Sequence, residues 1–370
     1  RDSVASRGLG DVYKRQVDLL GVRSRTQVTP KVVAQRGETL TAVGAFCIGT
    51  NQLALDDLAR AGVAAFNAPF SNTRSVVELV ISEIIALARR LGDRNTQMHH
   101  GVWRKSAIGS HEVRGRTLGI VGYGNIGAQV SVLAEALGLS VMYYDVADKL
   151  PMGNAHRCDS LEELLQSVDV VTVHVDGRAD NKLLFGEQEF SMMRPRSLFL
   201  NLSRGHVVDV AALADNLRTG HLAGAAVDVY PSEPRSGDEP FVSELQSLDN
   251  VILTPHVGGS TQEAQIDIGR YVAGKLIDYS ERASTSMSVN LPDITTDATP
   301  GARIGHLHLN MPGIMADLNR LVADHGGNVT YQALATRGEL GYTVLDIDET
   351  DRELLVDVTR LEGTIRARVL

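Results

Sequence analysis

The sequence predicts an α/β protein built on a doubly wound parallel sheet, and three observations support that fold class. Short apolar runs alternate with amphipathic stretches from residue 17 onward, as in a parallel sheet covered by helices. A glycine pattern, Gly122-x-Gly124-x-x-Gly127, lies between one such run and a helical stretch. The chain has 370 residues, of which 43% are hydrophobic, and this length favours two or three domains.

The first elements are read from residue 17. Residues 1–16 show neither a sustained strand period nor the apolar core of a signal peptide, and we exclude them as a non-native leader. The next apolar and helical runs predict strands at 17–22, 40–46 and 63–68, a helix at 53–62, and a long helix at 74–90.

The glycine pattern occurs in the order strand, turn, helix, strand. A strand is predicted at 117–121, a helix at 126–138, and a strand at 140–145 that ends on Asp145, eighteen residues after Gly127. The glycines permit a tight turn, close approach of a pyrophosphate and close helix packing, while Asp145 can accept hydrogen bonds from a ribose. No arginine follows Asp145, which favours NAD over NADP. A glycine-rich corner without a ligand is the alternative.

The strands that follow complete the doubly wound domain, which we expect over residues 72–261. They are predicted at 169–175, 197–203, 224–230 and 250–256. Asp209 is expected to cap a helix between the strands at 197–203 and 224–230, and Gly220 to end it.

Three polar residues follow successive strands of this sheet. They are Arg204, Glu233 and His256, and ligands of an open parallel sheet bind beyond the carboxyl ends of its strands. Taken singly, each residue type is more often a surface cation, a solvated acid or a satisfied histidine. Together they fit the oxidation of a 2-hydroxy acid: an imidazole takes the hydroxyl proton, a carboxylate raises the pKa of that imidazole, and a guanidinium holds the substrate.

Composition limits the class of partner. The net charge of −9 argues against a nucleic-acid partner. The sequence contains no run of eighteen apolar residues, so no membrane span is predicted. Cys47 and Cys158 are far apart and lack metal-ligand spacing, which indicates thiols in a reducing compartment and no metal site.

An anionic substrate must therefore be attracted by local cations. Arg23, Ser24 and Arg25 follow the first strand, and two guanidiniums with a hydroxyl can surround a phosphate dianion. A solvated turn is the alternative for this cluster. Lys105 is a further candidate cation, and Trp103 beside it is interpreted as a packing anchor.

The composition changes after the sheet. Residues 283–305 are rich in Ser, Thr, Pro and Asp and are interpreted as a connector. Residues 303–370 restart the strand and helix alternation and predict a small separate domain.

The motifs resemble those of one family. They are "FCIGTNQ", "NAPFSNTRSVVELVISE", "HGVWRK", "LGIVGYGNIG", "NLSRGHVVD", "LAGAAVDVYPSEP", "TPHVGGSTQEAQ" and "GTIRARVL". The chain resembles the D-isomer-specific 2-hydroxyacid dehydrogenase family, in its bacterial form with a C-terminal ACT domain. The resemblance implies a Rossmann-type NAD domain at 72–261, inserted in a flavodoxin-like substrate domain at 17–71 and 262–295. It also implies a ferredoxin-like α+β ACT domain at 303–370.

The family's site residues carry over position by position. The resemblance implies that Arg204, Glu233 and His256 are catalytic. It implies cofactor contacts at Gly122, Gly124, Asn125, Ile126, Gly127, Asp145 and Asp228, substrate contacts at Arg23, Ser24, Arg25, Ser71, Asn72 and Lys105, and an effector site for L-serine at His308, Asn310 and Asn328. Loop capping is the alternative for the last three residues.

The implied reaction is the NAD-dependent oxidation of 3-phospho-D-glycerate to 3-phosphohydroxypyruvate, the first step of serine synthesis, in a cytoplasmic homotetramer joined through NAD and ACT domains. Reduction of 2-oxoglutarate is an implied side activity. The alternatives are a glyoxylate or hydroxypyruvate reductase, which would not need Arg23 and Arg25, and a non-catalytic NAD-sensing binding protein.

The chain departs from the family at three places. Met311 replaces a cation of the family's effector motif, and Pro300-Gly301 replaces a flexible glycine pair. The family's first strand and helix of the substrate domain are not found in this sequence, so we expect an N-terminal truncation.

Overall fold

The computed structural model describes residues 17–36, 38–234, 238–299, 301–348 and 352–370. The leader at residues 1–16 and Pro300 therefore lie outside the described residues. The chain divides into two compact units, one formed by residues 72–265 and the other by the segments before and after it. Each unit is described below by itself.

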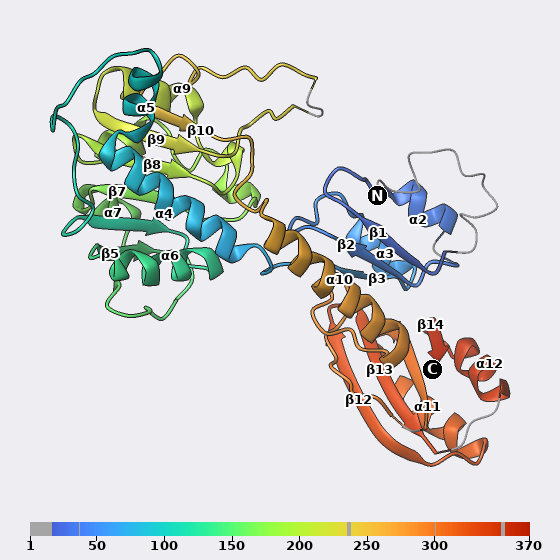
Figure 1. Ribbon diagram of the computed structural model, residues 1–370. Coiled ribbons are helices and arrows are strands. Elements are labelled where there is room, and N and C mark those ends of the chain that lie inside the picture. Colours follow the sequence, from blue (N-terminus) through green and yellow to red (C-terminus); the bar gives the residue numbers. More distant parts are fainter. Residues whose placement is uncertain (1–16, 37, 235–237, 300, 349–351) are drawn as a thin grey trace. The chain divides into compact units, whose positions relative to one another are not determined.

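The unit at residues 72–265 contains a seven-stranded parallel sheet (Figure 1). Its strand order is β10-β9-β8-β7-β4-β5-β6. The sequential order of the strands along the sheet reverses beside β4, the strand before the glycine turn. The strands are β4 (Thr117–Val121), β5 (Ser140–Tyr144), β6 (His156–Arg157), β7 (Val170–Val173), β8 (Ser197–Asn201), β9 (Leu222–Val227) and β10 (Val251–Leu253). The predicted doubly wound sheet is confirmed.

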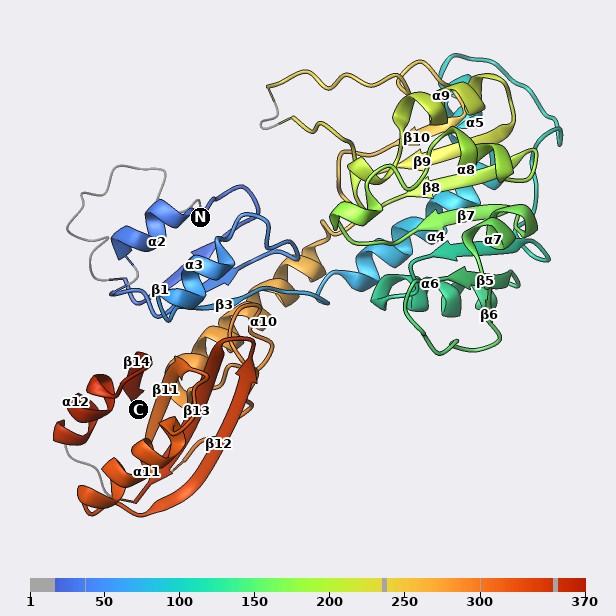
Figure 2. The ribbon, with the colours of Figure 1, turned by 180° about the vertical axis from the view of Figure 1, so that it is seen from behind.

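Helices cover both faces of this sheet, as the two opposite views show (Figures 1 and 2). One face packs against α4 (Thr73–Arg89) and α6 (Asn125–Ala136), with α5 (Leu91–His99) following α4. The other face packs against α7 (Leu161–Ser167), α8 (Glu187–Met192) and α9 (Val210–Arg218). Sheet residues such as Ile120 and Phe199 are fully buried between these layers. Burial on both faces explains why the strands are continuous apolar runs.

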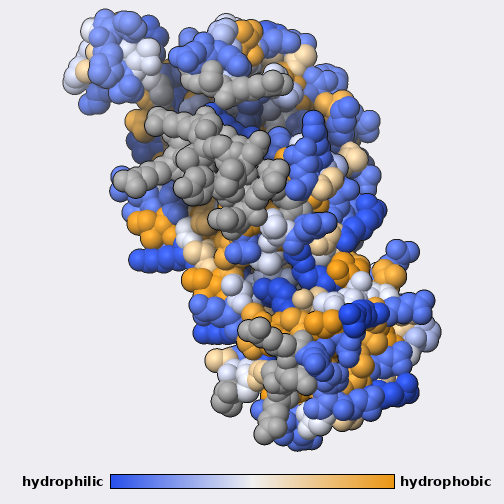
Figure 3. Space-filling view, turned by 90° about the vertical axis from the view of Figure 1, so that its right-hand side faces the viewer, coloured by the Kyte–Doolittle hydropathy of each residue, from blue (hydrophilic) through white to orange (hydrophobic). Residues whose placement is uncertain are grey.

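The other unit begins with a three-stranded parallel sheet in the order β1-β2-β3. Its elements are β1 (Leu19–Val22), α2 (Pro30–Arg36), β2 (Ala42–Ala45), α3 (Leu55–Arg60) and β3 (Ala64–Phe66). Helix α10 (Gln262–Arg282) packs Val272 and Leu276 into the same apolar cluster as Phe66. The surface seen in Figure 3 is mostly hydrophilic with scattered hydrophobic residues, as expected for a chain with 22% charged residues.

The last elements form a four-stranded antiparallel sheet of the ferredoxin-like type, in the order β12-β13-β11-β14. They are β11 (Ala302–Leu309), α11 (Ile314–Asp324), β12 (Val329–Arg337), β13 (Leu340–Ile347), α12 (Arg352–Arg360) and β14 (Thr364–Val369). Leu318 of α11 and Val358 of α12 are buried with Ile304 and Leu345 of the sheet. The ACT-type βαββαβ order implied by the resemblance is present.

The described residues 283–299 of the predicted connector form no helix or strand, and several of them are buried. Thr285 is fully buried, and its Oγ1 donates to the carbonyl of Pro292 at 2.6 Å. Asn290 bridges to β3 by accepting from the backbone N–H of Ala65 and donating to the carbonyl of Val63, both at 2.8 Å. The connector's serine, threonine and asparagine side chains satisfy buried backbone groups.

Candidate active site

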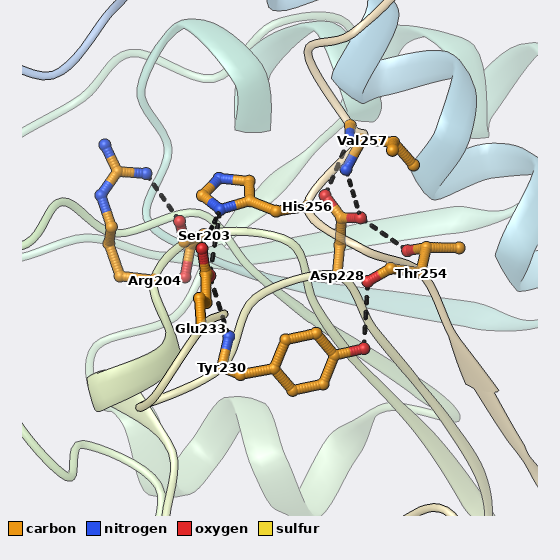
Figure 4. A network of polar contacts seen from close by, with 9 residues as sticks. Ser203, Arg204, Asp228, Tyr230, Glu233, Thr254, His256 and Val257 are labelled. Carbon is orange, nitrogen blue, oxygen red and sulfur yellow. Dashed lines mark hydrogen bonds and ion pairs between the residues drawn. The ribbon is translucent and has the colours of Figure 1, made fainter. Parts of the chain in front are cut away.

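Three strand ends of the seven-stranded sheet bring the predicted polar residues together. Arg204 follows β8, Glu233 follows β9, and His256 follows β10, and these strands are neighbours in the sheet. Because parallel strands end at one edge, residues distant in sequence meet there. Figure 4 shows the imidazole of His256 facing the carboxylate of Glu233, with the guanidinium of Arg204 beside them.

His256 and Glu233 form a direct pair. Nδ1 of His256 lies 3.0 and 2.9 Å from the two carboxylate oxygens of Glu233. Glu233 Oε1 also accepts the backbone N–H of Tyr230 at 3.2 Å, which fixes the carboxylate. A carboxylate that accepts at Nδ1 places the proton there and leaves Nε2 as the basic nitrogen. Nε2 has no hydrogen-bond partner within the described part of the chain, so it is available to a substrate.

The electrostatics of the pair follow from this geometry. The hydrogen bond and charge of Glu233 raise the pKa of His256 above its usual 6.5, against burial and the repulsion of Arg204. Burial by itself raises the pKa of Glu233. The hydrogen bond and the charge of His256 outweigh burial and lower the pKa of Glu233 below 4.5. The two shifts are those of an acid and base that hold each other in their charged forms.

The backbone at His256 is unusual. Its φ angle is +55°, in the left-handed region that non-glycine residues rarely adopt. Such a conformation persists only where neighbouring contacts enforce it. Those contacts come from Asp228, whose Oδ1 accepts the backbone N–H of Val257 and whose Oδ2 accepts that of Gly258, both at 2.8 Å. Asp228 therefore positions the loop that carries His256.

Arg204 is held by its own neighbourhood. Its guanidinium Nη1 donates to the carbonyl of Ser203 at 2.6 Å, and its carbonyl accepts from Asn201 Nδ2 at 3.1 Å. A Cβ on the following Gly205 would overlap the backbone of Tyr230, so only glycine allows the strand ends after β8 and β9 to approach this closely. The remaining guanidinium donors can bind a carboxylate or carbonyl oxygen.

The glycine turn has the geometry that a dinucleotide requires. Gly122 has φ +92°, and a Cβ on Gly127 would overlap the carbonyl of Gly122, so both positions need glycine. Gly124 faces open space at the N-terminus of α6, where Asn125 and Ile126 begin the helix. A pyrophosphate fits this position because the first helical N–H groups have no partner within the helix.

Asp145 lies beside this turn. Its Oδ2 accepts the backbone N–H of Tyr123 at 2.7 Å, and its Oδ1 accepts that of Ala147 at 2.8 Å. The carboxylate is thus fixed at the end of β5, with lone pairs left for a ribose diol. The residues present therefore fit NAD.

The substrate residues implied by the resemblance belong to different units. Arg23, Ser24 and Arg25 are exposed after β1, and Ser71 ends the first segment of that unit. Asn72, before α4, and the exposed Lys105 belong to the unit with the seven-stranded sheet.

The structure does not bring the three effector candidates together within one chain. His308 and Asn310 lie at one end of the antiparallel sheet, where Asn310 donates its backbone N–H to Glu339. Asn328 precedes β12 at the opposite end, where its backbone N–H donates to Oδ1 of Asp348 at 2.8 Å. Strand β12 has nine residues, so the ends are separated by about 27 Å.

His308 is buried, and both ring nitrogens have partners. Nδ1 lies 2.8 Å from the carbonyl of Leu309, and Nε2 lies 3.0 Å from Oγ1 of Thr343. Burial lowers the pKa of His308. Its ring occupies the space that Gly341 leaves on the neighbouring strand, since a Cβ there would overlap it.

Two buried residues at the site were not predicted from the sequence. Glu83 of α4 is 3% exposed, and its carboxylate oxygens have no hydrogen-bond partner among the described residues. His174 follows β7, its Nε2 lies 3.0 Å from Oγ1 of Thr172, and burial lowers its pKa to about 3. The helical period contains the signal for Glu83, because it falls on the buried face of α4 with Val76 and Val80.

Across the residues that the structure describes, no three His, Cys, Asp or Glu side chains are grouped to hold a metal ion. No helix in those ranges is long and apolar enough to cross a membrane.

Comparison with known proteins places the chain in a family. A profile described as D-isomer specific 2-hydroxyacid dehydrogenase, NAD binding domain, matches residues 81–258, and one described as AHAS small subunit-like ACT domain matches residues 304–366. The D-3-phosphoglycerate dehydrogenase of Escherichia coli K12 is 49% identical over 359 residues, covering 96% of this chain and 87% of that protein. The enzyme of that name from Dictyostelium discoideum is 46% identical over 358 residues, with 96% and 87% covered.

Solved structures agree with the fold. A D-lactate dehydrogenase from a Sporolactobacillus species is 26% identical with a TM-score of 0.66, and the match covers 75% of this chain and 87% of that one. The glycine turn, the paired His256 and Glu233, and these similarities lead to one conclusion. The chain belongs to the D-isomer-specific 2-hydroxyacid dehydrogenase family and is an NAD-dependent oxidoreductase with a C-terminal ACT domain.

Proposed function

We propose that this chain oxidises 3-phospho-D-glycerate to 3-phosphohydroxypyruvate with NAD. The observation that supports the reaction type is the paired His256 and Glu233 beside Arg204, on the unit that carries the glycine turn. The support for this substrate is the cation pair Arg23 and Arg25, together with relatives named D-3-phosphoglycerate dehydrogenase.

The residues divide the chemistry among them. Nε2 of His256 takes the proton of the C2 hydroxyl as the C–H bond at C2 breaks, and the resulting imidazolium is stabilised by Glu233. The guanidinium of Arg204 binds the substrate carboxylate and the oxygen that becomes the ketone. NAD, when bound, accepts the hydride. The products are the ketone, NADH and the proton held by His256.

The phosphate group of the substrate requires local cations, because the net charge of the whole chain is −9. Arg23 and Arg25 lie at the carboxyl end of β1, with the hydroxyl of Ser24 between them in sequence. Two guanidiniums can bind a phosphate dianion through charge-assisted hydrogen bonds. Ser71, Asn72 and Lys105 remain candidates for further substrate contacts.

An Arg25→Ala variant tests the substrate assignment. We expect kcat/KM for 3-phospho-D-glycerate to fall by about 10- to 100-fold, the effect of one lost charge-assisted interaction. The rate with unphosphorylated D-glycerate should change less than about twofold, because that substrate has no phosphate to bind. Lys31→Ala, which removes another exposed cation from the same unit, is the matched control and should leave both rates unchanged.

The outcomes separate the alternatives. Equal losses on the two substrates would contradict a phosphate site and favour a glyoxylate or hydroxypyruvate reductase. Binding of NAD without turnover of 3-phospho-D-glycerate, D-glycerate, glyoxylate or hydroxypyruvate would favour a non-catalytic NAD-sensing protein. Reduction of 2-oxoglutarate is a proposed side activity, since its second carboxylate can replace the phosphate.

L-serine is proposed as the effector of the ACT domain. Asn310 and Asn328 lie at opposite ends of one sheet, so a single serine site built from both needs a second copy of the domain. Antiparallel pairing of two β12 edges about Ala333 would place Val329 of one copy opposite Arg337 of the other. Arg337 pairs with Leu340 at the same end as Asn310, which brings the two asparagines together.

A second contact surface supports a homotetramer. Trp103 is 79% exposed and Ile108 is 81% exposed in the unit with the seven-stranded sheet, and large exposed apolar side chains mark association surfaces. One two-fold contact there and one through β12 would join four chains. The cytoplasm is the proposed compartment, supported by the free thiols of Cys47 and Cys158.

A further inference from the structure

Glu83 is an acidic residue at a buried, apolar position of α4. It lies on the buried face of α4 with Val80 and Ile84, and the residue is 3% exposed. Neither carboxylate oxygen has a hydrogen-bond partner among the described residues. An ionised carboxylate without partners is very costly inside a protein, so the group keeps its proton instead.

The charged group that acts electrostatically on Glu83 is Asp228, the residue after β9. Burial, followed by the charge of Asp228, raises the pKa of Glu83 to about 8. Tyr230 interacts electrostatically with both acids, and burial raises its pKa, so it is neutral in this range. Glu83 is therefore the acid that keeps its proton at neutral pH.

Asp228 connects Glu83 to the reacting centre. Its Oδ1 accepts from Thr254 Oγ1 at 2.6 Å and from the N–H of Val257, and its Oδ2 accepts from the N–H of Gly258. These contacts hold the residues on both sides of His256 (Figure 4). Hydride transfer would require the nicotinamide beside the carbon whose hydroxyl meets His256, and Asp228 would then be near that ring because it holds the residues on both sides of His256.

The nicotinamide ring carries a positive charge in NAD⁺ and none in NADH. We propose that Glu83, buried near Asp228, senses this charge, so that Glu83 releases its proton when NAD⁺ binds and keeps it when NADH binds. A cation beside an acid favours its ionised form, and the reduced ring offers no such compensation. Linkage then requires NAD⁺ to bind more tightly as pH rises through the titration of Glu83.

Glu83 would set the preference between the two cofactor forms. Below the titration range Glu83 is neutral and contributes little to the choice. Above it, two negative charges lie near the ring and favour the oxidised form. The inference rests on the NAD binding of the proposed function but not on the identity of the substrate.

Calorimetry of cofactor binding alone tests the inference. The protein is titrated with NAD⁺ and with NADH at pH 7.5, once in phosphate and once in Tris buffer. The difference between the heats measured in the two buffers gives the number of protons released on binding. We expect wild type to release roughly half a proton more with NAD⁺ than with NADH, and its NAD⁺ Kd to fall about fivefold between pH 7 and 8.5. The glutamine of Glu83→Gln cannot titrate. The variant should therefore lose the extra proton release with NAD⁺ and the part of the pH dependence of the NAD⁺ Kd that comes from Glu83.

Two controls make the result decisive. His256 also responds to the charged ring, and its share persists in Glu83→Gln, so the difference between the two proteins isolates Glu83. Glu78→Gln on the same helix, whose exposed carboxylate pairs with Arg74 at 2.6 Å, should behave as wild type. Glu83→Met provides the same test if the glutamine variant does not fold, because an apolar side chain suits the buried position.

Equal proton release by wild type and by Glu83→Gln or Glu83→Met would overturn the inference. That outcome would leave the proposed reaction intact, because turnover of 3-phospho-D-glycerate is measured separately. Loss of turnover on that substrate with the expected proton release would instead overturn the proposed substrate only.

Discussion

His256 is the residue on which the proposed chemistry depends, and its surroundings explain its conformation. The positive φ is maintained by the Asp228 contacts on one side and by Glu233 on the other. A residue held in a rare conformation by several hydrogen bonds is already oriented before the substrate binds. The orientation of the imidazole therefore depends on two carboxylates with different tasks: one fixes the ring and the other fixes the loop.

Glu233→Gln tests the first of these tasks. The amide cannot supply the charge that raises the pKa of His256, so that pKa should fall toward or below 6.5. Oxidation requires the neutral imidazole, and the acid limb of the kcat/KM profile should therefore move to lower pH, with a lower maximum because the imidazolium is less stabilised. The profile of Glu78→Gln should match that of wild type. An acid limb that stays in place in Glu233→Gln would contradict the assignment.

The same pair makes a modest contribution to folding stability with a defined pH window. The raised pKa of His256 gives stability that is complete below 6.5 and lost as pH rises through the folded value. The lowered pKa of Glu233 gives stability that is present above 4.5 and lost as pH falls through the folded value. The contribution is therefore largest between about pH 4.5 and 6.5, and solvent screening of these half-exposed groups keeps it small.

At residue scale the sequence predicts the polar groups but not the buried acid. Arg204, Glu233 and His256 could be inferred because each follows a strand, and parallel strands end at one edge. Glu83 lies within an ordinary helix, where an acid is usually solvated. Only its place on the apolar face, combined with the position of Asp228, distinguishes it from the exposed Glu78.

At the scale of elements, the glycine turn contains one glycine that the fold requires, Gly127, and one that we assign to cofactor binding, Gly124. Gly127 is required by the fold, since a Cβ there would overlap the carbonyl of Gly122. Gly124 has φ −83° and open space around it, so the protein itself can accommodate a methyl group. That open space lies at the N-terminus of α6, where a pyrophosphate would approach.

Gly124→Ala should therefore separate cofactor binding from stability. We expect the melting temperature to change by less than about 2 °C, while the Kd for NADH rises by about tenfold or more because the methyl group holds the pyrophosphate away from the turn. Thermal unfolding and fluorescence titration measure the two effects. Gly269→Ala, at an open position on α10, is the matched control for stability. Unchanged NADH affinity in Gly124→Ala would contradict binding at this turn.

The elements also show where sequence patterns suffice. Buried parallel strands are continuous apolar runs, and the predicted strand at 169–175 contains β7, all of whose residues are buried. The helix cap at Asp209 is confirmed, because its Oδ1 accepts the N–H groups of Ala211 and Ala212. The described residues between α10 and β11 form no helix or strand, as a connector predicts, but the sequence does not show that their polar side chains bond inward, because that direction depends on packing against β3.

For the whole molecule, a single chain contains the proposed catalytic residues but not a complete effector site. The catalytic trio comes from neighbouring strands of one sheet, whereas His308 and Asn328 belong to opposite ends of another. The sequence could name these effector candidates through a family resemblance. It could not show that they are far apart in one chain, because that separation depends on the register of β12 and β13.

Assembly through β12 is tested by a charge on its outer edge. Leu334 is 47% exposed on β12, the strand at one edge of the antiparallel sheet. In Leu334→Asp, each carboxylate would lie opposite Gln332 of the other copy, with the two carboxylates diagonal to each other near the two-fold axis, and like charges at such close positions across paired strands are destabilising. We expect sedimentation to detect dimers instead of tetramers, with turnover of 3-phospho-D-glycerate retained and inhibition by L-serine lost. Val356→Asp, at a 45% exposed position on α12, should remain tetrameric and serine-sensitive. A Leu334→Asp tetramer that L-serine still inhibits would show that β12 does not join the subunits.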